Sequence, residues 1–149
     1  MYSVKVLEHF QNPHNYGKIK NPSGVGKAGN LRCGDLMHLY IKVDKDEVIK
    51  DIKFETFGCA AAIATSSVVT DLAKGKKVQD ALRISSQDIV KSLGGLPIVK
   101  IHCSLLAMDA LAEAVYDYLK KNKKEIPKEI EKKHKVLEKQ KKEIEKRYK

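Results

Sequence analysis

The chain has 149 residues, of which 42% are hydrophobic, and it carries a formal net charge of +10. This length suffices for one domain with a core, and the hydrophobic content argues against a wholly disordered chain. No apolar run approaches the roughly 18 residues that a membrane span requires, and no apolar signal segment opens the sequence. We therefore expect a cytoplasmic protein without a membrane partner.

The positive charge is concentrated at the C-terminal end. Residues 1–119 carry 15 basic and 13 acidic side chains, whereas residues 120–149 carry 14 basic and 6 acidic ones. A high pI is typical of nucleic-acid-binding proteins, but the near balance of charge in the body makes nucleic acid an unfavoured partner. A nucleic-acid-binding module that uses the basic tail remains an alternative. Its salt-sensitive binding should disappear on deletion of residues 123–149.

The first part of the chain predicts one helix and a long loop. Residues 3–11 have the pattern of a short helix that Ser3 can cap, and Asn12–Pro13 ends it. Glycine and proline recur through residues 13–35, which predicts a loop with a short edge strand at 24–31.

The next part predicts a hairpin followed by helices. Apolar and polar residues alternate over 36–43 and 47–57, which predicts two antiparallel strands with one wet face. Helical patterns then follow at 60–73, 78–83, 86–93 and 103–121. We therefore expect an α+β fold, in which a small antiparallel three-stranded sheet packs against a group of helices, with a charged helical extension at the C-terminus.

The extension begins near Pro127 and consists almost entirely of lysine and glutamate. Ile130, Leu137 and Ile144 recur seven residues apart, which makes a thin apolar stripe. A single solvated helix is the favoured interpretation, and coiled-coil pairing or docking is the alternative. We divide the chain into a domain of residues 1–122 and a tail of residues 123–149.

Three cysteines carry the strongest chemical signal. Their odd number argues against a disulfide framework and favours metal binding or a reactive thiol. Cys33 precedes a strand, Cys59 lies between a strand and a helix, and Cys103 opens the long helix. Helix N-termini favour the thiolate, which is a soft metal ligand. Three thiolates leave one position open on a tetrahedral metal or a two-iron cluster, and Asp35 or His102 can fill it.

The other titratable residues have no comparable context. We expect four histidines to lie on the surface: His9, His14, His38 and His134. Three acidic residues spaced four apart on the long helix are expected to form a solvated face rather than an acid–base pair: Asp109, Glu113 and Asp117.

Four motifs in order then carry a resemblance. They are YSVKVLEHFQNPHNYG at 2–17, CGD at 33–35 with LMHLYIKV, FETFGC at 54–59 with AAAIATSS, and LPIVKIHCS at 96–104. Over roughly residues 2–122 the chain resembles the IscU/NifU N-terminal family of iron–sulfur cluster scaffolds. His102 and the lack of an insertion between the second and third cysteines make it similar to the IscU-like branch.

The resemblance implies a scaffold without turnover of its own. Such proteins accept sulfur from a cysteine desulfurase, assemble a transient 2Fe–2S cluster and pass it to acceptor proteins. Carried over, Cys33, Cys59 and Cys103 are the ligands, Cys103 is the persulfide acceptor, and Asp35 or His102 is the fourth ligand. Because Zn²⁺ accepts the same thiolates, the alternative is a zinc-bound, sulfurtransferase-like acceptor that enhances a desulfurase.

One further segment is similar to the family's chaperone-binding motif. Leu96-Pro97-Ile98-Val99-Lys100 has the extended, proline-fixed form that suits a peptide groove, here of a DnaK/HscA-type chaperone. Ile98 departs from the motif, which usually has a second proline there. A simple helix-entry turn is the alternative.

Overall fold

The computed structural model describes residues 2–30 and 35–147. The helices and strands confirm the expected α+β fold and occur in one order along the chain. They are α1 (Val4–Gln11), β1 (Gly24–Asn30), β2 (Asp35–Val43), β3 (Ile49–Thr56), α2 (Ala60–Ala73), α3 (Val78–Ala81), α4 (Ser86–Ser92), η1 (Ile98–Lys100), α5 (His102–Lys121) and α6 (Lys128–Arg147). Within the described ranges, none of the helices combines the length and apolar composition that a bilayer span requires.

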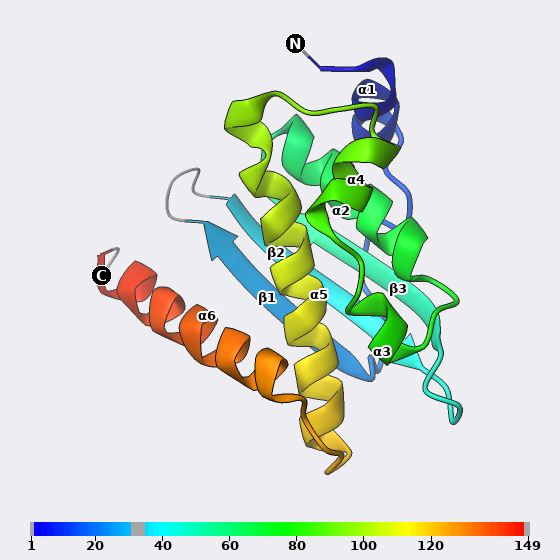
Figure 1. Cartoon of the computed structure of the whole chain (residues 1–149), viewed down its shortest axis with the longest axis vertical. Coiled ribbons are helices and arrows are strands. Elements are labelled where there is room, and N and C mark those ends of the chain that lie inside the picture. The colour runs from blue at the N-terminus through cyan, green and yellow to red at the C-terminus, as the bar shows by residue number, and fades with distance from the viewer. Residues whose placement is uncertain (1, 31–34, 148–149) are drawn as a thin grey trace.

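The three strands form one antiparallel sheet in the order β1-β2-β3. Alternation along β2 places Met37, Leu39 and Ile41 on the covered face, where all three are fully buried. Helix α5 lies against β1 and β2, and α2 lies against β3, so that both helices cover one face of the sheet (Figure 1). The hydrophobic core lies between these two layers.

Two glycines of β1 set the distance between the sheet and α5. A Cβ atom added to Gly26 would lie 1.9 Å from the carbonyl oxygen of Ala110, and one added to Gly24 would lie 2.2 Å from that of Ala114. No side chain fits such a gap, so only glycine lets the strand backbone approach the helix backbone this closely. The position of α5 on the sheet therefore depends on these two residues.

The tail is not the solvated helix that its sequence favours. Helix α6 packs against α5 (Figure 1), and its Ile130 side chain is buried. Lys133 Nζ lies 2.8 Å from Asp109 Oδ1, and His134 Nδ1 lies 2.6 Å from Glu113 Oε2. The docking alternative is therefore right, because acidic groups on α5 supply partners that the tail's own sequence does not reveal.

The solvated acidic face expected on α5 is wrong for the same reason. Asp117 accepts a hydrogen bond of 2.9 Å from the Val25 amide and pairs with Lys121. His134, expected at the surface, stacks on Tyr116 with ring centroids 3.8 Å apart. This row of acidic residues is a docking surface for α6 and β1.

Candidate metal centre

Two of the three cysteines meet at one end of the molecule. Cys59 is the N-cap residue of α2, and Cys103 is the second residue of α5. Cys103 is buried and Cys59 is half-buried, and their Sγ atoms lie 3.8 Å apart. The fold thus brings together positions that are 44 residues apart in the sequence.

The distance between the two sulfur atoms has a chemical meaning. It is far longer than the S–S bond of a disulfide, which is about 2.05 Å. Two thiolates bonded at about 2.3 Å to one tetrahedral metal ion lie about 3.8 Å from each other. The 3.8 Å spacing of Cys59 and Cys103 fits two ligands of one metal ion as well as a direct contact between two thiols.

Both cysteines lie at the start of a helix that has no side-chain cap. Neither Cys59 at the start of α2 nor Ile101 at the start of α5 makes a side-chain capping hydrogen bond. The partial positive charge at the start of each helix therefore lies next to a cysteine.

His102 adds a further donor to this end of the molecule. Its Nε2 atom lies 3.7 Å from the sulfur of Cys103. The Thr65 hydroxyl donates to the Cys103 carbonyl oxygen at 3.3 Å, which ties the start of α5 to α2. Helix α2 thus helps to position both cysteines.

Cys33 lies outside the described residues. Asp35 is described only by its backbone, which begins β2 and pairs with Asn30. Met37 pairs with Thr56 at the end of β3, so β2 begins at the end of the sheet where β3 leads to Cys59. Participation of these two residues in the site stays a prediction.

Tyr2 is a half-buried neighbour of the thiols that sequence patterns did not single out. Burial raises the pKa of Tyr2 and the charge of Cys59 raises it further, whereas Lys100 lowers it. The hydroxyl therefore keeps its proton and is available as a hydrogen-bond donor. Tyr2 reaches the thiols through tertiary packing. The neighbouring Ser3 hydroxyl donates to the Leu93 carbonyl oxygen and so holds the N-terminal residues in place.

Large apolar side chains near the thiols remain exposed. Phe57, two residues before Cys59, is 88% exposed, and Ile98 and Val99 in η1 are 87% and 74% exposed. Leu96 instead packs against the core. Exposed apolar groups of this size are typical of a surface that binds other proteins. The extended form expected for residues 96–100 is wrong at Ile98–Lys100, which form the short helix η1 after Pro97. Binding of a chaperone to residues 96–100 stays a prediction.

Residues 1–125 match the model of the NifU-like N-terminal domain family. The iron–sulfur cluster assembly scaffold protein IscU 1 of Archaeoglobus fulgidus is 60% identical over 124 residues, which cover 83% of this chain and 80% of that protein. The scaffold protein IscU of Aquifex aeolicus is 50% identical over 121 residues, covering 80% and 77%. Helix α6 lies beyond the family match.

A solved structure gives the same result for the fold. The crystal structure of a protein assigned as a cluster assembly scaffold for the SUF system of Fervidobacterium islandicum superposes with a TM-score of 0.64. The two chains are 28% identical, and the match covers 76% of this chain and 96% of that one.

Proposed function

The chain belongs to the NifU-like N-terminal domain family, and on this premise we propose that it is a scaffold on which iron–sulfur clusters are assembled. The observation that carries this function is the pair of thiols, Cys59 and Cys103, held 3.8 Å apart at two helix N-termini. The cluster is cargo that the scaffold receives and hands on. The names of the relatives favour this function over the zinc-bound sulfur acceptor.

We assign the cargo as a 2Fe–2S cluster bound by three thiolates, those of Cys33, Cys59 and Cys103. Soft thiolates are the ordinary ligands of such clusters. Because the spacing of the Cys59 and Cys103 sulfur atoms fits two ligands of one ion, we assign both to the same iron. Cys33 and one further residue then complete the site.

Asp35 and His102 compete for the remaining position. A hard carboxylate is a poor match for an iron–sulfide site, so Asp35 should keep the cluster labile enough to leave. Asp35→Ala is then expected to slow transfer to an acceptor apoprotein, whereas His102→Gln should leave that rate closer to wild type. Equal transfer rates for Asp35→Ala and wild type, measured by circular dichroism, would reject this role.

We assign Cys103 as the acceptor of sulfur from a cysteine desulfurase. The Cys103 thiolate attacks the outer sulfur of the donor's persulfide; a new S–S bond forms as the old one breaks, and the donor leaves as a thiolate without net oxidation. Because Cys103 is buried, η1 or the start of α5 must open first. Mass spectrometry of the trapped persulfide should therefore find it on Cys103 in the wild-type chain. The Cys103→Ser variant should carry no persulfide on its remaining cysteines.

The proposal also assigns protein partners, a chaperone-binding segment and a cellular location. Exposed apolar residues beside the thiols, such as Phe57 and Val99, suit contact with a desulfurase and with cluster acceptors. Residues 96–100 are assigned as the segment that a DnaK/HscA-type chaperone would bind. The cytoplasm is the assigned location.

Anaerobic reconstitution with ferrous iron, cysteine and a desulfurase tests the function. We expect a visible chromophore with iron and sulfide in equal amounts, and its loss in each cysteine-to-serine variant. A colourless protein that retains zinc and still takes up sulfur would reject the scaffold assignment. A cluster retained after loss of any two cysteines would reject the ligand set.

A further inference from the structure

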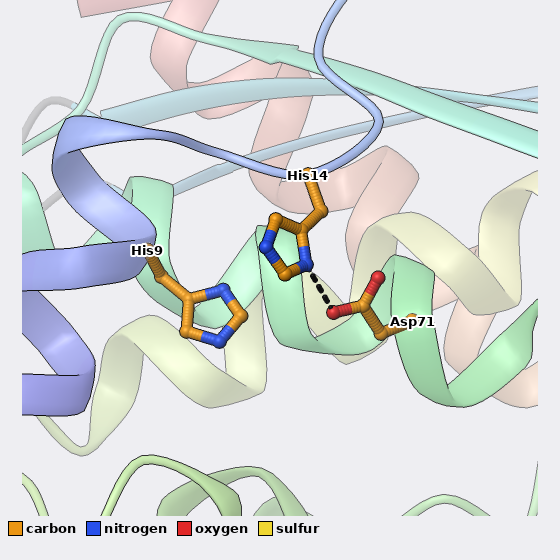
Figure 2. A group of neighbouring side chains, drawn as sticks. All are labelled: His9, His14 and Asp71. Carbon is orange, nitrogen blue, oxygen red and sulfur yellow. Dashed lines mark hydrogen bonds and ion pairs between the residues drawn. The ribbon is translucent and has the colours of Figure 1, made fainter.

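A second group of metal-ligating side chains lies along α2, away from the thiols. His9 comes from the last turn of α1, His14 from the loop that follows, and Asp71 from the last turn of α2 (Figure 2). One donor atom from each residue lies within 4.8 Å of the other two. Asp71 is 12 residues beyond Cys59 on α2, so about 18 Å of helix separates this group from the cysteines.

His9 and His14, which the sequence predicts to be ordinary surface residues, make specific hydrogen bonds to α2. Nδ1 of His9 lies 2.7 Å from the Ser67 hydroxyl, and the backbone amide of His14 donates to the same hydroxyl at 2.8 Å. Nδ1 of His14 lies 2.5 Å from Asp71 Oδ2 (Figure 2). Both imidazoles are thus oriented by partners on α2.

The carboxylate of Asp71 also accepts a hydrogen bond from Asn15. Asn15 Nδ2 lies 3.3 Å from Asp71 Oδ1 and 3.0 Å from the Thr70 hydroxyl. Hydrogen bonds from neighbouring groups to ligating imidazoles and carboxylates are what fix a metal site's first ligands in most metalloproteins. The cluster therefore has the supporting contacts of a built site as well as the donors.

The donor set defines the class of ligand. Two imidazoles and one carboxylate, with no thiolate, suit a divalent first-row transition-metal ion such as Zn²⁺ or Fe²⁺, and they leave a position for water. Hard cations such as Ca²⁺ prefer all-oxygen sites. The second site therefore differs in kind from the cysteine site.

The geometry needs only a small adjustment to close around an ion. Donors bonded at about 2.1 Å to a tetrahedral ion lie about 3.4 Å apart. The donors are at most 4.8 Å apart, so any pair must approach by no more than roughly 1.4 Å. If His14 Nδ1 and Asp71 Oδ2, now 2.5 Å apart, both bind the ion, they must separate by roughly 0.9 Å. His14 and Asp71 have half-exposed side chains, with relative exposures of 53% and 41%, so torsion changes can supply this movement without disturbing the core.

We propose that His9, His14 and Asp71 bind one divalent transition-metal ion at a site independent of the cysteines. The bound ion cross-links α1, the following loop and α2. Because it binds only where these segments are docked, it stabilises the folded chain by linkage. This inference does not depend on the scaffold function, since none of its residues belongs to the thiolate site.

The test titrates Zn²⁺ into the full-length chain in which the cysteines are replaced, C33S/C59S/C103S, so that thiolates do not take the metal. Isothermal titration calorimetry should give one bound equivalent. Asp71→Asn and His14→Gln in that background should each weaken binding at least about 10-fold, and Ser67→Ala should weaken it about 10-fold through loss of orientation.

Matched controls lie elsewhere on the chain. Asp80→Asn removes an exposed carboxylate from α3, and His134→Gln removes an imidazole from α6; neither should change the affinity for Zn²⁺. A chain that binds no Zn²⁺ equivalent, or that binds it equally well after Asp71→Asn and His14→Gln, overturns the proposal.

A second measurement does not depend on how the triple variant folds. In the wild-type chain, imidazole ¹⁵N signals are followed while two equivalents of Zn²⁺ are added. The ring signals of His9 and His14 should shift together as one of the two equivalents binds. Any change at His102 should follow the other equivalent. Rings of His9 and His14 that do not respond to Zn²⁺ overturn the proposal in the native protein as well.

Discussion

The two ends of helix α5 follow opposite structural rules. Toward its C-terminus, the helix is tightly partnered: β1 approaches its backbone at Gly24 and Gly26, and α6 pairs with its acidic row. At its N-terminus, the helix begins without a side-chain cap, and apolar residues of the preceding turn stay exposed beside Cys103.

The difference separates the part of the helix that stabilises the fold from the part that does chemistry. A helix start without a side-chain cap and exposed apolar groups both cost free energy, and proteins retain such features where a ligand or partner uses them. Close packing and paired charges serve stability instead. Substitutions at the two ends should therefore change different measured quantities, and four experiments can break or sharpen this separation.

The largest effect is expected for Cys103→Ser. A hydroxyl is a poor ligand for iron, so cluster retention should fall to background, while the free energy of unfolding of the apo protein changes by about 1 kcal/mol or less. Iron and sulfide analysis measures the first quantity, and denaturant unfolding measures the second. Leu105→Ser, at an exposed neighbouring position, should retain the cluster. A large loss of stability in Cys103→Ser would show that this end is structural as well.

The reverse result is expected for Gly26→Ala. The new Cβ would lie 1.9 Å from a backbone carbonyl of α5, and overpacking against backbone should cost about 3 kcal/mol of folding free energy. Guanidinium unfolding measures this cost. Lys27→Ala, at the exposed next position, should cost less than about 0.5 kcal/mol. Unchanged stability of Gly26→Ala would mean that the helix can move away from β1 without penalty.

Sequence reasoning reached the chemical end of α5 because its signals are local. Cys59 and Cys103 each open a helix, and period-two alternation in β2 gives the covered face of the sheet. Such patterns follow from backbone geometry and need no knowledge of distant contacts.

The residues that pair with α5 toward its C-terminus could not be predicted from local sequence patterns. Asp109 and Glu113 look like solvated residues until Lys133 and His134, more than 20 positions away, are placed against them. The His9–Asp71 neighbourhood was missed for the same reason, since 62 positions separate residues that only the docking of α1 on α2 brings together. Pairings of this kind depend on tertiary structure, which propensity and periodicity do not encode.

A moderate effect is expected for Ile130→Ala in the tail. Ile130 is 8% exposed and anchors α6 on α5, so its truncation should weaken docking by about 2 kcal/mol. Amide hydrogen exchange should then accelerate in α6 while β2 keeps its protection, because the tail opens as a local unit. Val136→Ala, at a position 56% exposed on the same helix, is the matched control. Equal acceleration in both variants would contradict anchoring by Ile130.

The smallest effect concerns the titration of Glu113 beneath the tail. Burial raises the pKa of Glu113 above its ordinary 4.5, although the hydrogen bond from His134 opposes the shift. The folded state then holds the proton more tightly than the unfolded state, so the contribution of this group to stability is full below pH 4.5 and is lost as the pH rises through the folded pKa.

Removal of the tail separates the two influences on that carboxyl group. In a chain that ends at residue 125, Glu113 loses the cover of α6 and the bond from His134 together. Since burial is the larger influence, the pKa measured by ¹³C NMR of the carboxyl carbon should fall toward 4.5. A pKa that rises instead would show that the His134 bond outweighs burial. The docked tail would then be held mainly by charge, and the contrast between the two ends of α5 would rest on electrostatics rather than on packing.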